Sequence, residues 1–197
     1  MLHLIGLQKQ NTALQSADYP FSVPVIRNFS SLAFTAPVCF WVGENGSGKS
    51  TLLEGLAAKL NLPTVGAKPV STDPSLAAAR SLAQCLRPVW QSKVIHRGFF
   101  LRAEDFFGFI QGMSRMRQEL AAEEEDIRRE MHSLGSSAYG IELATGSMRG
   151  NLNAVTKRYG ENPDGMSHGE SFLHLFSSRL SPNGIYLLDE PEAALSP

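Results

Sequence analysis

Apolar and polar positions repeat with two different periods along this chain, and each period predicts a different kind of element. Alternation, or a short continuous apolar run, is typical of strands, whereas apolar residues three and four apart are typical of amphipathic helices. Strands are predicted at 2–7, within 25–34, and at 37–42, 98–103 and 184–189. Helices are predicted at 49–60, 75–87, 104–132 and 167–180. The chain is therefore expected to mix strands and helices throughout.

The clearest of these patterns lies at positions 37–60. Pro37–Val42 is a continuous apolar run, which favours a buried strand. Lys49–Leu60 has leucines at 52, 53, 56 and 60, which lie on one face of a helix. A glycine-rich stretch joins the two. The pattern thus predicts a strand, a glycine loop and a helix in immediate succession.

The predicted helix at 104–132 carries apolar residues at a spacing close to a heptad repeat. These residues are Met113, Met116, Leu120, Ile127 and Met131, and charged residues surround them. Such a seam is typical of a short arm that docks a partner or a second copy, but it is also typical of a solvated helix that lies on its own domain. The stretch that follows, 135–165, is rich in glycine, serine and asparagine. We predict a loop there, with at most a short helix near 152–158.

Composition and charge add few constraints. The chain has 197 residues and a formal net charge of −1, so no overall field favours nucleic acid or a membrane surface. Cys39 and Cys85 lie in apolar contexts without metal or redox spacing, which predicts buried free thiols in a reducing compartment. No apolar run approaches the roughly 20 residues of a membrane span, and the N-terminus lacks the pattern of a signal peptide. We expect a cytoplasmic protein without a membrane span.

The glycine-rich stretch 43–50 matches G-x-x-x-x-G-K-[ST], the phosphate-binding P-loop. Its glycines let backbone N–H groups turn toward phosphate oxygens, and the helix N-terminus adds partial positive charge. Lys49 is expected to reach the β- and γ-phosphates, and Ser50 to hold Mg²⁺. The residues predicted to bind ATP here are Gly43, Glu44, Asn45, Gly46, Ser47, Gly48, Lys49, Ser50 and Thr51.

Two further motifs follow. The apolar strand at 185–188 ends in Asp189 and Glu190. Ligands bind at the carboxyl ends of strands in open α/β sheets, so Asp189 is predicted to join Ser50 at Mg²⁺ and Glu190 to polarise the attacking water. Ser167-x-x-Glu170 before an apolar run is a capping box. A capped helix N-terminus also binds anions, so the capping and phosphate-binding interpretations are compatible.

The order of the three motifs resembles that of the ABC-type ATPases. In that family the helix-start motif is the signature sequence, here Met166-Ser167-His168-Gly169-Glu170, and Asp-Glu-Pro-x-x-x-Leu joins the Walker B strand to the D-loop, here 189–195. The variant signature is similar to that of the soluble SMC-like DNA-repair ATPases and the AAA-family predicted ATPases of ABC type. The resemblance implies one α/β domain over 1–197: a mostly parallel sheet flanked by helices, an N-terminal antiparallel portion, and a helical and loop insertion at about 104–165.

The resemblance also implies roles for single residues. Ser167 and Gly169 would bind the γ-phosphate of ATP held by a second subunit, in a head-to-tail homodimer. Residues 100–105 stand where the family has its Q-loop glutamine, which leaves open whether Arg102 or Glu104 touches the metal or water. Tyr19 or Phe21 would stack on adenine, with core packing as the alternative.

Two departures from the family pattern stand out. Ser196 replaces the usual D-loop aspartate, and the switch histidine, which the family carries on a later strand, has no counterpart among the five histidines. We therefore expect a fragment of a longer protein, without that protein's final strand and switch histidine; a naturally short form is the alternative.

The leading hypothesis is a soluble ATPase that dimerises on ATP and opens on hydrolysis. One alternative is the nucleotide-binding subunit of a membrane transporter, which shares every residue named above. Another is a nucleotide-binding switch, scaffold or inactive fragment without turnover. A partner protein is left unidentified, and a nucleic-acid role follows by analogy with the SMC-like relatives alone.

Overall fold

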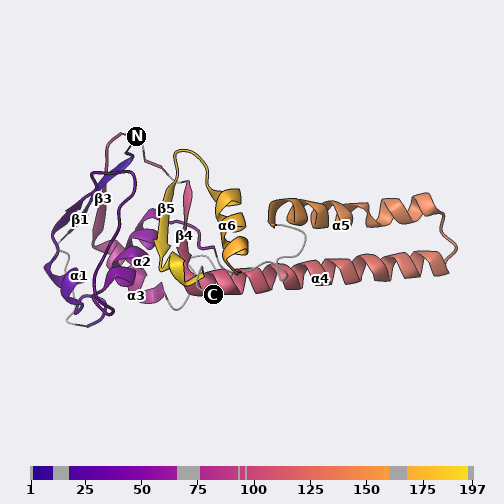
Figure 1. The fold of residues 1–197 in the computed structure, drawn as a ribbon, viewed down its shortest axis with the longest axis horizontal. Coiled ribbons are helices and arrows are strands. Elements are labelled where there is room, and N and C mark those ends of the chain that lie inside the picture. Colours follow the sequence, from indigo (N-terminus) through magenta and orange to yellow (C-terminus); the bar gives the residue numbers. More distant parts are fainter. Residues whose placement is uncertain are drawn as a thin grey trace. The chain divides into compact units, whose positions relative to one another are not determined.

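The computed structural model describes residues 2–10, 18–65, 76–92, 94–95, 97–159 and 168–194 (Figure 1). Its elements are β1 (Leu4–Lys9), α1 (Pro24–Asn28), β2 (Ser31–Ala33), α2 (Lys49–Leu60), α3 (Ala77–Gln84), β3 (Leu86–Trp90), β4 (Gly98–Arg102), α4 (Ala103–Ser133), α5 (Ala138–Tyr159), α6 (His168–Arg179), β5 (Ile185–Asp189) and the 3₁₀ helix η2 (Pro191–Ala194). The mixed α/β character predicted from the sequence is confirmed. The chain forms two compact units, Met1–Asp105 with Ser181–Pro191, and Phe106–Leu180 with Glu192–Pro197.

The first unit contains an antiparallel sheet in the order β2-β1-β3. Leu7, in β1, lies opposite Leu32 on one side and Pro88 on the other. This sheet matches the antiparallel N-terminal portion expected from the resemblance. Lys9, at the end of β1, donates through Nζ to the carbonyl oxygens of Ile26 and Arg27, at 2.7 Å each. A cation at the C-terminus of α1 satisfies carbonyls that have no partner inside the helix, and so it fastens α1 to the sheet.

A parallel pair, β4 and β5, carries the strand ends that matter for the site. Their register runs from Gly98 opposite Ile185 to Arg102 opposite Asp189. Gly98 has φ +143°, and a Cβ there would lie 1.7 Å from the Ile185 carbonyl oxygen, so glycine permits the close approach. On its other side, Phe100 in β4 exchanges backbone hydrogen bonds with the stretch Pro63–Val65. The parallel order brings the C-terminal ends of β4 and β5 to one edge.

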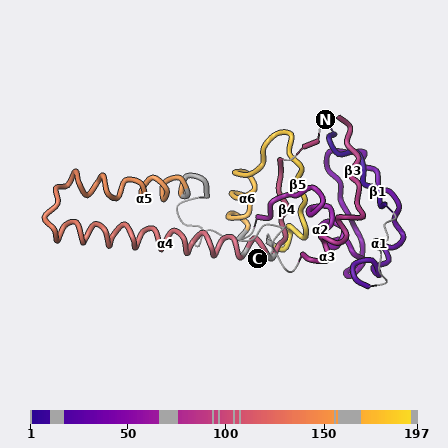
Figure 2. The backbone as a smooth tube through the Cα atoms, turned by 180° about the vertical axis from the view of Figure 1, so that it is seen from behind, coloured from indigo at the N-terminus to yellow at the C-terminus, as the bar shows by residue number. Residues whose placement is uncertain are grey.

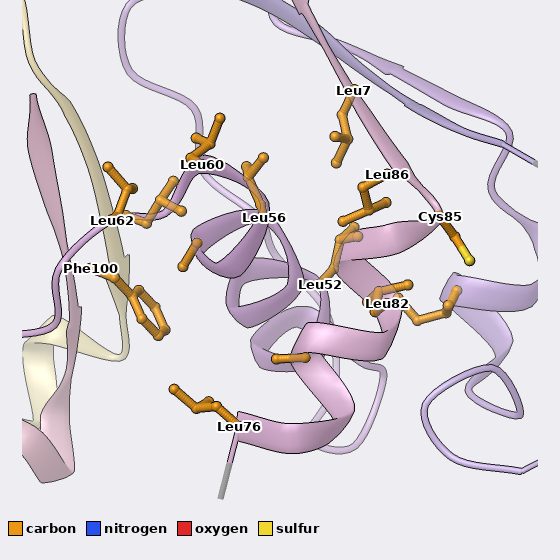
Figure 3. Close-up of a cluster of buried hydrophobic side chains, with 14 of the residues drawn as sticks. Leu7, Leu52, Leu56, Leu60, Leu62, Leu76, Leu82, Cys85, Leu86 and Phe100 are labelled. Carbon is orange, nitrogen blue, oxygen red and sulfur yellow. The ribbon is translucent and has the colours of Figure 1, made fainter. Parts of the chain in front are cut away.

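Helix α2 lies at the centre of the hydrophobic core of the first unit (Figure 3). Leu52 and Leu56 are buried, and Figure 3 shows them between Leu82 and Leu86 on one side and Phe100 on the other. The helix begins and ends where the sequence predicts. Asn61, with φ 51°, is the left-handed residue that ends it.

The predicted strand at 37–42 is wrong. The run begins with a bend and pairs with no described strand, and Val38, Phe40 and Val42 are 68%, 86% and 93% exposed. Trp41 alone packs against the core. The run has the composition of a strand, but a strand needs a neighbour to accept and donate its hydrogen bonds. Cys39, predicted to be buried, is exposed for the same reason, whereas Cys85 is buried as predicted.

The other sequence predictions for the first unit are confirmed in part. The stretch 25–34 contains the predicted strand, as β2, but it begins with the short helix α1. The helix expected from 75 is α3, and it ends before Pro88, which lies within β3. The dipeptide Asp73-Pro74 also predicts an N-cap for this helix, but it lies outside the described residues. Among the described strands, the parallel pair β4–β5 is outnumbered by the antiparallel pairs, so the mostly parallel sheet expected from the resemblance stays a prediction.

The second unit is helical. Helix α4 covers the helix predicted at 104–132, and α5 lies beside it in both views (Figures 1 and 2). The loop predicted at 135–165 is wrong, because α5 covers most of it. The Ser137 hydroxyl accepts a hydrogen bond from the Gly140 N–H at 3.2 Å, a helix N-cap that offsets the low helix propensity of the glycines and serines.

The seam expected on α4 is only partly covered in the structure. Met113 is buried, but Met116 is 48% exposed. Charged side chains link α4 to α5 instead, since Arg149 in α5 donates to Glu124 in α4 at 2.9 Å. Arg149 also donates to Glu142 of its own helix, at 2.7 Å. Within the described part of the chain, every helix is too short or too polar to cross a membrane.

Candidate functional site

The glycine loop at 43–48 turns directly into α2. Gly46 has φ +78° and Gly48 has φ +98°, the left-handed region in which glycine alone is unstrained. Gly48 is also the N-cap, and no side chain caps the helix there. A Cβ on Gly48 would lie 2.5 Å from Val23 and 2.7 Å from Val25, so the loop packs closely against the start of α1. The first N–H groups of α2 are thus left to an outside acceptor, as anion binding requires.

Lys49, the first residue of α2, folds back over the loop. Its Nζ donates to the carbonyl oxygens of Gly43 and Glu44, at 2.7 and 2.8 Å. These contacts hold the ammonium group within the loop and close the turn that the glycines begin. The predicted phosphate-binding lysine therefore holds its positive charge against the backbone of the glycine loop.

Ser50 and Asp189 meet although 139 positions separate them in the sequence. The Ser50 hydroxyl donates to Asp189 Oδ1 at 3.1 Å. Mg²⁺ takes octahedral ligands at about 2.0–2.1 Å, so neighbouring ligand oxygens lie about 3 Å apart. The Ser50–Asp189 separation fits one edge of such an octahedron. No cluster of three or more histidine, cysteine or acidic side chains suited to a metal occurs among the described residues.

The surroundings of the Asp189 carboxyl disfavour its ionised form. Burial raises the pKa of Asp189 above its usual range, and the neighbouring charge of Glu190 raises it further. The hydrogen bond from Ser50 and the positive charges of Lys49 and Arg102 act in the opposite direction. A cation bound beside this carboxyl would relieve the penalty of burial.

Glu190 lines a hollow that the glycine loop borders. This hollow has a volume of about 270 Å³. Its lining residues are Tyr19, Val23, Asn45, Gly46, Gly48, Lys49, Ser50, Thr51 and Glu190. Glu190 is exposed and has φ 48°, a left-handed conformation that is uncommon for a residue with a side chain. Backbone strain of this kind clusters at functional sites.

The structure separates the two candidates for adenine stacking. Phe21 is buried in the core, whereas Tyr19 borders the hollow with an exposed ring. The Tyr19 hydroxyl lies 3.3 Å from the Thr51 hydroxyl in α2. Core packing thus accounts for Phe21, and Tyr19 is the aromatic that a bound nucleotide could meet.

The stretch 100–105, which the resemblance places at the Q-loop, contains an ion pair. Arg102 donates through Nε and Nη2 to the two carboxylate oxygens of Asp105, both at 2.8 Å. Arg102 Nη1 also lies 3.8 Å from Glu54 Oε1 on α2. The guanidinium is committed to these acids and is not free to act on water. The side chain of Glu104 lies outside the described residues.

The signature motif is described only in part. Ser167 lies outside the described residues, and Gly169 is the second residue of α6 in the second unit. The predicted contact of Ser167 and Gly169 with a second subunit's phosphate stays a prediction. Within the first unit, the structure brings together the loop at 43–51, Asp189 and Glu190.

Three residues beside the site escaped the sequence analysis. Val23 lines the hollow, and Glu54 and Asp105 hold Arg102. Glu54 could have been found, because it stands four positions after Ser50 and therefore shares its face of α2.

Comparison with protein-family models, with curated proteins and with solved structures gave no match.

Proposed function

We propose that this chain binds ATP with Mg²⁺ and hydrolyses it at the β–γ phosphoanhydride. The observation that carries the proposal is the contact between Ser50 and Asp189 at 3.1 Å, next to a loop whose Lys49 faces the same hollow. A glycine loop alone binds many anions. A hydroxyl and a carboxylate one Mg²⁺ edge apart beside that loop favour a magnesium–phosphate ligand.

Each side chain has a distinct task in the proposed reaction. Lys49 and the N–H groups at the start of α2 stabilise the charge on the transferred phosphoryl group. Ser50 and Asp189 would hold Mg²⁺, which neutralises phosphate charge when bound. Glu190, at the rim of the hollow, aligns and polarises the attacking water. Tyr19 offers its ring to the base.

The head-to-tail homodimer is part of this proposal, with Ser167 and Gly169 contributed by the second copy. It rests on the resemblance to ABC-type ATPases. Sedimentation of the chain with and without ATP and Mg²⁺ tests it: an ATP-dependent doubling of mass supports the dimer, and a constant mass contradicts it.

The binding test is a calorimetric titration of the purified chain with ATP in the presence of Mg²⁺. Lys49→Ala removes a charge-assisted contact and should weaken ATP binding by about 10–100-fold. Lys59→Ala is the matched control, because Lys59 is an exposed lysine of the same helix. Equal affinities for the two variants would contradict the proposal.

The catalytic test uses Glu190→Gln. This variant keeps the shape of the side chain but not its basicity, so ATP should bind within about threefold of wild type while turnover falls by about 100-fold or more. Phosphate release gives the rate. Wild-type turnover in Glu190→Gln would remove Glu190 from the mechanism, and tight ATP binding without any turnover in the wild type would make the chain a nucleotide switch.

A further inference from the structure

Helix α2 is attached to the ends of β4 and β5 at two points, one helical turn apart. Ser50 and Glu54 are four residues apart and share one face of α2. Asp189 and Arg102 are paired neighbours at the ends of the two strands. Ser50 contacts Asp189, and Glu54 contacts Arg102, at 3.1 and 3.8 Å.

The second attachment is an ion pair at longer range, but its Arg102 end is firmly held. The Arg102 side chain is only 10% exposed, and the two hydrogen bonds to Asp105 fix its plane. A bidentate arginine–carboxylate pair has a defined geometry that a single ammonium contact lacks. Arg102 therefore presents its remaining nitrogen to Glu54 from a fixed position.

The first attachment uses the two side chains that would hold Mg²⁺. If Ser50 and Asp189 held the ion, their hydrogen bond to each other would not be available to attach α2 to the strand ends. The contact of Glu54 with Arg102 involves neither ligand. It is therefore a polar attachment between α2 and the strand ends that does not depend on the metal, in addition to the packing of α2 against Phe100 in the core.

We propose that Arg102 is a positioning residue for the magnesium–nucleotide complex. Through Glu54 it holds α2 against the ends of β4 and β5, so that Ser50 and Asp189 stay one coordination edge apart. This inference rests on the proposed function, since it concerns the same site.

Substitution of Arg102 separates positioning from simple charge. If only its charge mattered, Arg102→Met would remove a cation that attracts the phosphates and repels Mg²⁺, so ATP binding would weaken no more in Mg²⁺ than in EDTA. If Arg102 positions α2, the same variant binds ATP about tenfold more weakly in Mg²⁺, while binding in EDTA stays within about twofold. The measured quantity, called the affinity ratio, is the ATP affinity in Mg²⁺ divided by the ATP affinity in EDTA, both obtained by calorimetry.

Loss of the buried partner of Asp105 is destabilising, so Arg102→Met can fail to fold. Arg102→Lys is the second variant, which keeps the experiment decisive in that case. Lysine keeps the charge but not the bidentate geometry, so the affinity ratio should again fall. Arg149→Met is the matched control, since it removes an ion-paired arginine from the second unit. Its affinity ratio should equal that of the wild type.

The possible results assign failure to one proposal or the other. Wild-type protein that does not bind ATP overturns the proposed function and this inference with it. If the wild-type protein binds ATP with Mg²⁺, two results overturn the positioning role alone. One is an unchanged or higher affinity ratio in Arg102→Met, and the other is an unchanged ratio in Arg102→Lys. Equal losses in Mg²⁺ and EDTA for either variant also overturn it, because they indicate general loss of structure.

Discussion

At the scale of single residues, the site depends on a few side chains whose chemistry can be seen in the sequence. The motif at 43–50 was predictable because phosphate binding requires glycines at fixed places and one lysine. Asp189 was predictable because it ends an apolar strand. The positions of Glu54 and Asp105 were not, because their roles depend on the fold that brings Arg102 between them.

Asp189→Asn should make the protein without metal more stable at neutral pH. Burial raises the pKa of Asp189 in the folded state, so the folded protein holds this proton more tightly than the unfolded chain does. Ionisation then lowers the stability as the pH rises from the unfolded value toward and through the folded one. Asparagine removes that penalty and keeps an acceptor for Ser50.

The measurement is the melting temperature in EDTA from pH 4 to pH 8. The gain of Asp189→Asn over wild type should grow with pH and shrink toward pH 4. Glu119→Gln, on the exposed surface of α4, is the control. A wild-type protein more stable than Asp189→Asn across the whole range would show that the Asp189 charge stabilises the fold.

At the scale of elements, helices with a strong apolar face were predicted well, and α2 shows why. Its leucines face the core, and Asn61 ends it, so local pattern and tertiary contacts agree. Helix α5 was missed because its glycine, serine and asparagine content lowers helix propensity. Its N-cap at Ser137 and its ion pairs with α4 compensate, and contacts between helices cannot be read from one segment alone.

Glu124→Gln should loosen α5. The hydrogen bonds from Arg149 and Arg128 hold the pKa of Glu124 below its usual range, so the charged form is favoured in the folded state. This stabilisation is present above the unfolded pKa and is lost as the pH falls through the lower, folded value. At pH 7, backbone amides of α5 should therefore exchange with solvent severalfold faster in the variant.

Hydrogen exchange measured by mass spectrometry checks this, with Glu130→Gln as a matched control from the exposed side of α4. The exchange of α2 should be unchanged in both variants, because the ion pairs lie within the second unit. Equal exchange of α5 in Glu124→Gln and Glu130→Gln would show that the Arg149 contact contributes nothing measurable.

At the scale of the whole molecule, the chain divides into two units. The boundary after Asp105, near the start of α4, lies close to position 104, where the sequence places the start of an insertion, but the second unit extends past 165 to Leu180 and so includes α6. The α/β class follows from the local patterns. How strands pair does not, since Pro37–Val42 has every local property of a strand and no described partner.

The exposure of the run Pro37–Val42 has a measurable consequence for stability. A buried phenylalanine truncated in a core costs about 3–5 kcal/mol, but Phe40 is 86% exposed, so Phe40→Ser should change the free energy of unfolding by less than about 0.5 kcal/mol. Leu7→Ala, at a fully buried position of β1, should cost about 2–5 kcal/mol. Chemical denaturation gives both values. A large loss in Phe40→Ser would restore the buried strand predicted from the sequence.

The exposure of Cys39 has a practical consequence. Cys85 is wholly buried, so a maleimide dye added to the folded chain should react at Cys39 alone. That thiol stands four positions before Gly43. The native sequence therefore supplies a single attachment point for a fluorophore beside the glycine loop, where its emission can report on ligand binding without any cysteine being added or removed.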